Sequence, residues 1–364
     1  MKINIIIQGD CLAELKKLPE ESIDCCITSP PYWGLRDYGT AKWEGGDEKC
    51  NHIQKLLTHG GEAKRPYQKE VKYQYKEICK KCGAKRIDQQ LGLEKTPEEY
   101  TEKLVEIFRD VKRVLKKEGT CWLNLGDSYS SHKDCKSVPQ TIANNKKRGA
   151  IEKGKSVSRD SKMLKSVGLK NKDLVGIPWR VAFALQKDGW YLRQDIIWNK
   201  PNPMPESVTD RCTKSHEYIF LLTKSPKYYF DNEAIKEKSI DKESYRGMRK
   251  RPKYIKGYPK EMGENNFDEL EGKKYPTRNK RSVWTITTRP YSEAHFATFP
   301  EHLIEPMVMA GCPKEGIVLD IFMGAGTTGL VAKKLKRNWL GIELNPEYIK
   351  IAEKRIKGQT PPLF

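Results

Sequence analysis

The chain has 364 residues, 37% hydrophobic and 32% charged, so it can form one large or two ordinary domains around a sizeable core. Its net charge of +20 favours a polyanionic partner such as nucleic acid, although thermophiles and AT-rich genomes also encode lysine-rich proteins. No apolar run reaches 18 residues, and the apolar stretch near the start ends at Gln8, so we expect neither a membrane span nor a signal peptide. We therefore expect a cytoplasmic protein whose ten cysteines are thiols or metal ligands.

Short apolar strands alternate along the chain with amphipathic helices. The expected strands are 3–7, 23–28, 121–125, 191–198, 217–223, 317–321 and 339–343. The expected helices are 11–17, 97–116, 178–187, 301–310, 327–336 and 346–357, the second with Thr96 and Glu99 as a capping box. This alternation predicts an α/β fold with a mostly parallel sheet and helices on both faces.

Positive charge is concentrated in two segments that are poor in periodic apolar residues. Residues 133–172 hold 12 basic and 3 acidic residues, and residues 236–281 hold 15 basic and 8 acidic residues. Each segment is interpreted either as a solvated loop or as a surface for nucleic acid. Residues 36–92 are expected to be irregular. The predicted organisation is 1–35, an insertion at 36–92, 93–232 with the basic loop 133–172, a second insertion at 233–282, and 283–364.

A glycine-rich loop near the C-terminus has the form of a nucleotide-binding fingerprint. In DIFMGAGTTG, residues 320–329, the glycines let the backbone approach a ligand, and the helix that follows offers free N–H groups. The next strand ends at Glu343, whose carboxylate can accept two hydrogen bonds from a ribose diol. A purely structural glycine turn is the alternative interpretation.

Three features of this loop favour S-adenosylmethionine over NAD. Asp320 would attract the ammonium group of the former and repel the diphosphate of the latter. Thr327 and Thr328 occupy positions where a pyrophosphate loop prefers small apolar residues. Only 21 residues follow Glu343, so the remaining strands of the sheet must come from the N-terminal part of the chain, in a permuted order.

The loop and an N-terminal motif together resemble one enzyme family. DIFMGAGTTG with IELN (342–345) resembles the cofactor motif of amino-directed DNA methyltransferases, and TSPPY (28–32) resembles their catalytic motif. Because the catalytic motif comes first, the resemblance is to the beta group of that family, and residues 6–15, 195–232 and 295–313 match it as well. It implies a Rossmann-like, circularly permuted sheet with a target-recognition insertion, and the spacing of metal-type residues separately predicts a zinc-knuckle-like insertion. The resemblance also implies S-adenosyl-L-methionine as cofactor, double-stranded DNA as substrate, a cognate restriction endonuclease, and a homodimer as a further option.

The resemblance also assigns roles to single residues. The catalytic residues are Ser29, Pro30, Pro31 and Tyr32. The cofactor-binding residues are Asp10, Thr28, His295, Phe299, Pro300, Asp320, Phe322, Gly324, Gly326, Thr327, Thr328, Glu343 and Asn345. Asp10 would lie near the cofactor adenine, and it is equally placed to cap the helix that follows it. His295 taken alone is more typical of a surface or core histidine.

The TSPPY motif suits methyl transfer to an exocyclic amine. Such a nitrogen is a poor nucleophile because its lone pair is delocalised into the ring, so a catalyst must accept hydrogen bonds from its N–H groups. The Ser29 side chain and the Pro30 carbonyl are acceptors, and a Pro-Pro backbone has no N–H group to compete for them. Tyr32 can stack on a flipped base. A proline-rich loop that merely ends a strand is the alternative.

The chemistry leaves the target base open. Serine at the first position of SPPY resembles the cytosine-N4 enzymes more than the adenine-N6 enzymes, which usually carry aspartate there. The Pro-Cys step of carbon-5 enzymes is absent from the sequence. We therefore favour N4 of cytosine, with N6 of adenine as the alternative. More distant alternatives are a nucleic-acid-binding protein without catalysis and an NAD-dependent oxidoreductase.

Two pairs of metal-type residues lie in the first insertion. Cys50 and His52 form one pair, and Cys79 and Cys82, followed by a glycine, form the other. A tetrahedral Cys₃His zinc site would order this segment, and free thiols in a loop are the alternative. For DNA, Trp198 and Lys200 are interpreted as a wall of the base pocket or as a rigid surface turn. The expected DNA contacts in the second insertion are Arg249, Lys250 and Arg251.

Overall fold

The computed structural model describes residues 1–34, 42–60, 67–74, 78–87, 90–130, 167–239, 276–288 and 300–358. His295 and Phe299 lie outside these residues, as do most of the two basic segments. The expected DNA contacts Arg249, Lys250 and Arg251 lie outside them too. None of the described helices is long and apolar enough to cross a membrane.

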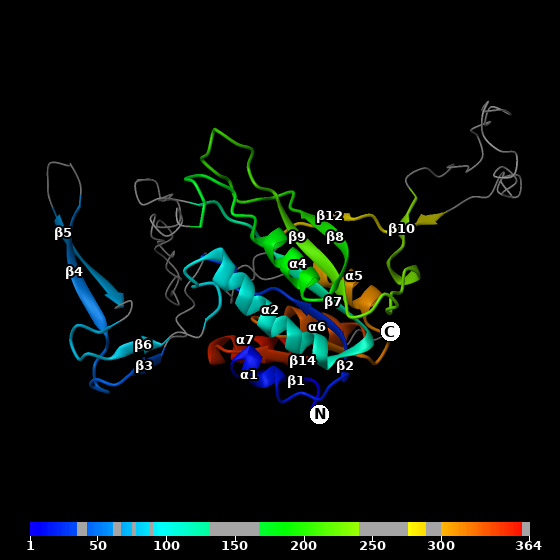
Figure 1. The fold of residues 1–364 in the computed structure, drawn as a ribbon, viewed down its shortest axis with the longest axis horizontal. Coiled ribbons are helices and arrows are strands. Elements are labelled where there is room, and N and C mark those ends of the chain that lie inside the picture. Colours follow the sequence, from blue (N-terminus) through cyan, green and yellow to red (C-terminus); the bar gives the residue numbers. More distant parts are fainter. Residues whose placement is uncertain are drawn as a thin grey trace, which may run out of the picture.

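The main sheet has eight strands in the order β1-β14-β13-β2-β7-β9-β8-β12 (Figure 1). Every strand runs parallel to its neighbours except β9, which is antiparallel to both β7 and β8. The prediction of a mostly parallel sheet is therefore confirmed. The bounds are β1 (Ile5–Gln8), β2 (Ile23–Thr28), β7 (Leu115–Leu125), β8 (Tyr191–Asn199), β9 (His216–Thr223), β12 (Val283–Thr285), β13 (Ile317–Asp320) and β14 (Asn338–Glu343).

The permuted strand order is visible in the pairing at one end of this sheet. The two C-terminal strands β13 and β14 lie between the two N-terminal strands, because β1 pairs with β14 and β2 pairs with β13. Since all four strands are parallel, their carboxyl ends meet at the same edge of the sheet. The TSPPY motif begins at Thr28, the last residue of β2, the glycine loop follows β13, and Glu343 ends β14, so the topology brings the three together.

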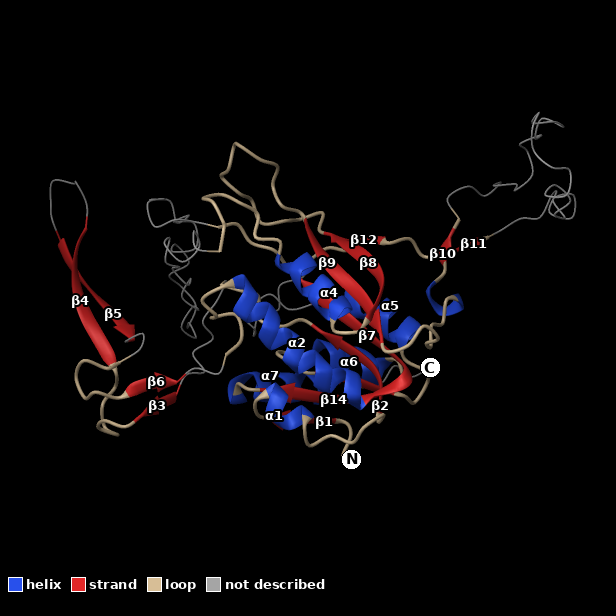
Figure 2. Ribbon diagram, in the orientation of Figure 1, coloured by secondary structure: helices blue, strands red, loops and turns tan. Residues whose placement is uncertain are grey.

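Helices cover both faces of the sheet, as predicted (Figure 2). Residues of α1 (Cys11–Leu15), α2 (Pro97–Val114) and α4 (Ile177–Lys187) share one core cluster with the sheet, and residues of α5 (Glu301–Gly311), α6 (Thr327–Lys334) and α7 (Pro346–Lys357) share the other. Successive strand residues alternate between the clusters. Cys26 faces the first and Cys25 the second, so both act as small buried apolar residues.

The long helix α2 begins where its sequence signals predict. The Thr96 hydroxyl accepts a hydrogen bond from the Glu99 N–H group at 3.1 Å, while the Glu99 carboxylate accepts from the Lys95 N–H group at 3.0 Å. The helix stops at Val114, two residues earlier than predicted, because Leu115 adopts extended dihedral angles and starts β7. Strand β7 is therefore longer than the expected 121–125.

The expectation of an irregular segment at 36–92 is wrong for its described part. Strands β3 (Lys42–Glu44) and β6 (Lys85–Ile87) form one antiparallel pair, and β4 (Ile53–Gly60) and β5 (Tyr67–Gln74) form a hairpin. In Figure 1 these strands stand away from the main sheet. These strands could not be predicted from the sequence, because they are formed by backbone hydrogen bonds and their residues show little apolar periodicity.

A further pair of short strands joins the two ends of the second insertion. Strand β10 (Glu237–Lys238) pairs antiparallel with β11 (Thr277–Arg278). The short helix η2 (Glu233–Ile235) leads into β10. Residues near the two ends of the second basic segment therefore lie next to each other.

Candidate active site

The catalytic and cofactor motifs are joined by a buried carboxylate at the end of β13. Asp320 accepts hydrogen bonds from the Thr28 hydroxyl at 2.7 Å and from the Thr328 hydroxyl at 2.6 Å. Its Oδ1 atom also accepts from the Phe322 N–H group at 3.1 Å. Thr28 belongs to TSPPY and Thr328 to the glycine loop, so this side chain fixes the two motifs against each other.

Asp320 is almost completely shielded from solvent, since only 2% of the residue is exposed. Burial raises the pKa of its carboxyl group, and the donors from Thr328, Thr28 and Phe322 oppose that rise because they stabilise the charged form. Asp320 thus serves first as a brace between β2 and α6. Its expected contact with the ammonium group of a cofactor stays a prediction.

Glu343 is held beside the loop by backbone donors. Its Oε2 atom accepts a hydrogen bond from Gly324 N at 2.8 Å, and its Oε1 atom accepts from Asn345 N at 2.8 Å. Burial raises the pKa of this carboxyl group, and the charge of Asp320 adds to the effect. Each carboxylate oxygen can accept a second bond, so the arrangement suits a ribose diol. Asn345 also caps α7 by accepting from Glu347 N.

The glycines and threonines of the loop divide between two tasks. A Cβ atom at Gly326 would lie 2.8 Å from the Cβ atom of Ala352, so this glycine is needed for close packing of the loop against α7. Thr327 also faces α7, because its hydroxyl accepts a hydrogen bond from Arg355 at 2.8 Å. Gly324, with φ of 49°, has open space on its Cβ side, which leaves room for a ligand.

The remaining cofactor residues that the structure describes surround this edge. Asp10 caps α1, since its Oδ1 atom accepts from Ala13 N at 3.0 Å, and the neighbouring Gly9 N–H group donates to the Glu343 carbonyl. Phe322 packs against one core cluster, and Pro300 is buried at the start of α5. Asp10 is therefore confirmed as a helix cap, and its role near an adenine stays a prediction.

The SPPY turn is anchored on both sides. The Pro31 carbonyl accepts a hydrogen bond from the Tyr100 hydroxyl at 2.9 Å, and the Trp33 indole donates to the Glu94 carbonyl at 3.0 Å. The Ser29 Oγ atom lies 3.5 Å from the Asn124 Oδ1 atom. Helix α2 and the segment before it thus hold the turn rigidly, which is what an array of preorganised acceptors requires.

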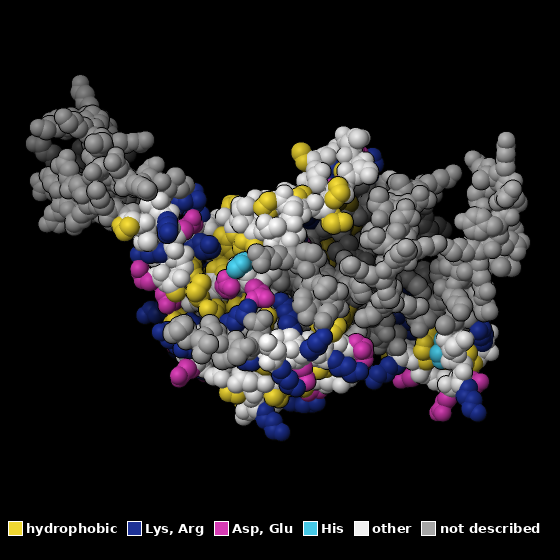
Figure 3. Space-filling view, turned by 180° about the vertical axis from the view of Figure 1, so that it is seen from behind, with side chains coloured by type: hydrophobic (Ala, Val, Ile, Leu, Met, Phe, Trp, Pro, Cys, Tyr) yellow, Lys and Arg dark blue, Asp and Glu magenta, His cyan; other side chains and the backbone are white. Residues whose placement is uncertain are grey.

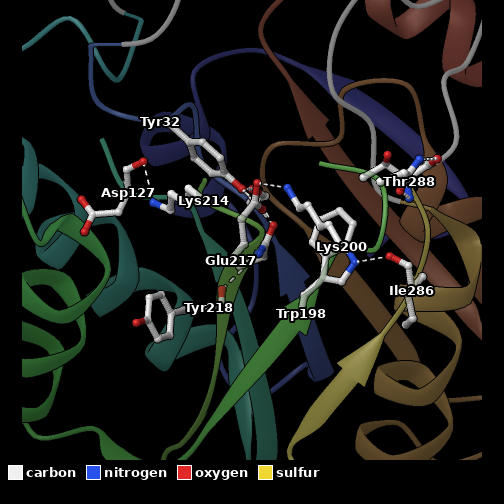
Figure 4. Close-up of polar contacts among 12 residues, drawn as sticks. Tyr32, Asp127, Trp198, Lys200, Lys214, Glu217, Tyr218, Ile286 and Thr288 are labelled. Carbon is white, nitrogen blue, oxygen red and sulfur yellow. Dashed lines mark hydrogen bonds and ion pairs between the residues drawn. The ribbon is translucent and has the colours of Figure 1, made fainter. Parts of the chain in front are cut away.

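Sequence reasoning missed a polar network that faces the turn from β7 and β9. The Tyr32 hydroxyl lies 2.7 Å from Glu217 Oε2 and 3.0 Å from Asn124 Oδ1. Lys200 forms an ion pair with Glu217 and lies 4.2 Å from the centroid of the Trp198 ring (Figure 4). Burial and the Glu217 carboxylate raise the pKa of Tyr32, so its hydroxyl keeps its proton. The available signals were Asn124 in the apolar run 121–125 and the acidic residue Glu217 at the start of β9.

Of the two predicted base-pocket residues, Trp198 lies within a strand and Lys200 lies just after it. Trp198 belongs to β8, which extends one residue further than predicted. The Trp198 side chain is buried, and its indole N–H group donates a hydrogen bond to the Ile286 carbonyl at 2.8 Å. Lys200 follows the strand, as expected. Lys214 donates to the Asp127 carbonyl at 2.8 Å, and burial lowers the pKa of its ammonium group (Figure 4). Two cationic side chains therefore lie near the SPPY turn.

The four metal-type residues converge in the first insertion. Ligand atoms of Cys50, His52, Cys79 and Cys82 all lie within 4.8 Å of one another. Elsewhere the described surface seen in Figure 3 carries basic and acidic side chains side by side, without one dominant basic patch on that face. This agrees with the sequence, which places most of the excess positive charge in the two basic segments.

Comparison with known proteins decides the family. The family model for DNA methylases of the N6/N4 type matches residues 23–354. The chain belongs to the N6/N4 DNA methylase family. The Type II methyltransferase M.Cfr9I of Citrobacter freundii is 40% identical to this DNA methylase over 354 residues, which cover 97% of the chain and 88% of the relative. M.SmaI of Serratia marcescens is 41% identical over 351 residues, or 96% and 90% of the two chains.

Two solved structures share the fold of this DNA methylase. The PvuII DNA methyltransferase matches 99% of the chain and 87% of its own, with a TM-score of 0.54 and 17% identity. A protein of Thermus thermophilus assigned as a DNA modification methylase, solved with S-adenosyl-L-methionine, matches 99% and 96%, with a TM-score of 0.52 and 18% identity. The predicted fold, family and methyl donor are confirmed, and the NAD-dependent alternative is set aside.

Proposed function

We propose that this DNA methylase transfers a methyl group to N4 of a flipped cytosine within a specific double-stranded DNA sequence. The observation that carries the proposal is the bond between Thr28 and Asp320 at 2.7 Å, which holds the SPPY turn directly against the cofactor loop. A methyl donor seated on that loop and a base seated against SPPY would be adjacent. In-line transfer depends mainly on such positioning.

Chemically, the proposed step needs acceptors rather than a strong base. S-adenosyl-L-methionine, when bound, supplies an electrophilic methyl group on a sulfonium. The Ser29 hydroxyl and the Pro30 carbonyl would accept hydrogen bonds from the amine of the base and direct its lone pair towards that methyl group. The nitrogen–carbon bond forms as the carbon–sulfur bond breaks, and the nitrogen then loses one proton through these acceptors to solvent.

Glu217 has a positioning role in this proposal. It accepts a hydrogen bond from the Tyr32 hydroxyl and is paired with Lys200, so it restrains an aromatic ring on one side and a cation on the other. Tyr32 would stack on the flipped base, and Lys200 with Lys214 would attract the phosphates beside it. Trp198 stabilises the wall behind Lys200 from within β8.

Two considerations support cytosine over adenine. Serine stands first in SPPY, and the PvuII enzyme that shares this fold is described as cytosine-N4-specific. Adenine N6 is the alternative, because its amine presents the same two N–H groups to the same acceptors. We further propose that the basic segment with Arg249, Lys250 and Arg251 contacts the DNA. Since the relatives are Type II methyltransferases, we also propose a cognate restriction endonuclease, and the homodimer stays a prediction.

Mass spectrometry of nucleosides tests the proposal directly. DNA from cells that express the protein is digested and compared with DNA from cells that express the Ser29→Ala variant. We expect N4-methylcytosine only with the unchanged protein. N6-methyladenine instead would overturn the choice of base and keep the amino-directed class, whereas the absence of both modified nucleosides would contradict the proposed activity.

A further inference from the structure

The first insertion contains four side chains arranged as a set of metal ligands. Cys50 and His52 lie before the β4/β5 hairpin, and Cys79 and Cys82 lie after it. The Cys50 and Cys79 Sγ atoms are 3.7 Å apart, and the Cys82 Sγ atom is 3.5 Å from the Nδ1 atom of His52. All four ligand atoms lie within 4.8 Å of one another. The chain therefore enters and leaves the β4/β5 hairpin at the cluster formed by these four side chains.

These separations match a tetrahedral zinc site. With Zn–S bonds of about 2.3 Å and Zn–N bonds of about 2.1 Å, tetrahedral geometry places two sulfurs about 3.8 Å apart and a sulfur about 3.6 Å from a nitrogen. A disulfide requires a sulfur–sulfur distance of about 2.05 Å, which the Cys50–Cys79 pair at 3.7 Å does not meet. Small side-chain rotations bring the wider pairs onto one ion.

The backbone around the cluster is shaped to present the ligands. Gly83 has φ of 76°, and its N–H group donates to the Cys79 carbonyl at 2.8 Å, which closes a knuckle turn between the two cysteines. On the other side, His52 has φ of 50°, a left-handed conformation that a residue with a side chain adopts at a cost. Its ring stacks on Trp43 with centroids 4.3 Å apart. These constraints orient the imidazole.

Close packing against the cluster involves a glycine in the turn that follows β3. Gly46 has φ of 73°, and a Cβ atom built there would lie 2.8 Å from the Cys82 Sγ atom. Its neighbour Gly45 has a similar φ of 70°, yet a Cβ atom there would meet nothing within 4 Å. Of these two adjacent glycines, Gly46 is therefore the one that leaves space for the Cys82 sulfur.

Apolar burial does not explain how this part of the insertion keeps its shape. Among residues 42–52 and 78–87, for which side-chain burial is described, only Cys79 and Ala84 are buried. Strands of three residues such as β3 and β6 supply few backbone bonds. These described residues therefore need a link other than apolar packing to hold them together, and structural metals provide one in small domains.

We infer that Cys50, His52, Cys79 and Cys82 bind one structural Zn²⁺ ion that clamps the base of the β4/β5 hairpin to the β3/β6 pair. Four protein ligands leave no open position for water or substrate, so the ion supports the fold and takes no part in chemistry. Three thiolates and an imidazole favour zinc over the harder cations Mg²⁺ and Ca²⁺. The inference does not rest on the proposed base specificity.

Metal analysis of the purified full-length protein tests this site. Elemental analysis should find about one zinc per chain, and the Cys79→Ser/Cys82→Ser double variant should lose it. Cys212→Ser is the matched control, because Cys212 is an exposed cysteine outside the cluster, and its zinc content should stay unchanged. Metal-free protein that is folded and active, or a Cys50–Cys79 disulfide found by mass spectrometry, would overturn the inference.

A second measurement decides the case if the double variant fails to fold. The wild-type protein is stripped with a chelator, reloaded with Co²⁺, and examined by visible spectroscopy. Intense absorption bands of tetrahedral cobalt with thiolate charge transfer should appear with one equivalent, and octahedral-type weak bands would contradict the site. Limited proteolysis should cut within residues 42–87 after chelation, while the affinity for S-adenosyl-L-methionine stays unchanged. A failed methylation assay with intact zinc would affect only the proposed function.

Discussion

The sheet edge at β2 and β13 and the Cys/His cluster of the first insertion both assemble residues from distant parts of the chain, but by opposite means. Thr28 and Asp320 are 292 positions apart and meet because parallel strands, packed between two buried clusters, carry them to one edge. Cys50 and Cys79 are 29 positions apart and meet where, among the described residues 42–52 and 78–87, only Cys79 and Ala84 are buried. At the edge, the hydrophobic core positions polar groups, whereas in the insertion polar ligands must position the backbone.

The largest effect that this comparison predicts is at Ser29. Ser29→Ala removes one acceptor from a rigid array without changing the fold, so kcat should fall by about a hundredfold or more while the dissociation constant for S-adenosyl-L-methionine persists. Steady-state kinetics and calorimetry measure the two quantities. The control Ser22→Ala, in the turn before β2, should leave both unchanged. Full turnover in Ser29→Ala would remove this serine from the mechanism.

Asp320→Ala should act on the cofactor rather than on the chemical step. The change removes the acceptor for the Thr28 and Thr328 hydroxyls, so the loop loses its brace and two buried donors lose a partner, at about 1–3 kcal/mol each. We expect the dissociation constant for S-adenosyl-L-methionine to rise about tenfold to a hundredfold, with a lower melting temperature. Asp188→Ala, which breaks an ion pair with Arg109 between the end of α4 and α2, is the control. An unaltered dissociation constant would contradict the role.

Glu343 should make cofactor binding depend on pH. Burial raises the pKa of its carboxyl group, so on acidification it takes up a proton earlier than an exposed glutamate and loses acceptor capacity for a ribose diol. Affinity for S-adenosyl-L-methionine should therefore fall as the pH falls through that raised pKa. By linkage, this group's contribution to folding stability is full at low pH and is lost as the pH rises through the same value.

The Glu343→Gln variant separates this effect from general acid sensitivity. It should bind the cofactor about tenfold more weakly at neutral pH, as expected for one lost charged hydrogen bond, and its affinity should no longer change over the same acidic interval. Binding calorimetry at a series of pH values measures both. Parallel pH profiles for the variant and the unchanged protein would assign the titration to another group.

The smallest predicted effect is in the insertion and uses two adjacent glycines. Both Gly45→Ala and Gly46→Ala place a side chain at positive φ, which costs about 1 kcal/mol. Only Gly46→Ala also brings a methyl group to within 2.8 Å of both the sulfur and the carbonyl oxygen of Cys82, so this variant alone should lose zinc several-fold faster to a chelator dye. Equal release rates from the two variants would mean that the sulfur does not need this space.

Much of the active-site edge could be predicted from local sequence patterns. Strand and helix ranges followed from apolar periodicity, and TSPPY and the glycine loop identified the family, because these motifs are contiguous. Glu217 and Asn124 were missed, since each lies within a predicted strand and meets Tyr32, its partner in the network, only across a long distance in sequence. Thr327 and Gly326 were assigned to a ligand, and the structure places both against α7.

The sequence by itself determined the alternation of strands and helices, the permuted order of the two motifs, and the pairs of cysteine and histidine residues in the insertion. Only the tertiary structure decided that Asp320 braces TSPPY against the cofactor loop, that Glu217 restrains Tyr32, and that four metal-type side chains converge. The reason is physical. Local patterns follow from backbone geometry and burial of neighbours, whereas a hydrogen bond between distant residues exists only after strand pairing has chosen which side chains share an edge.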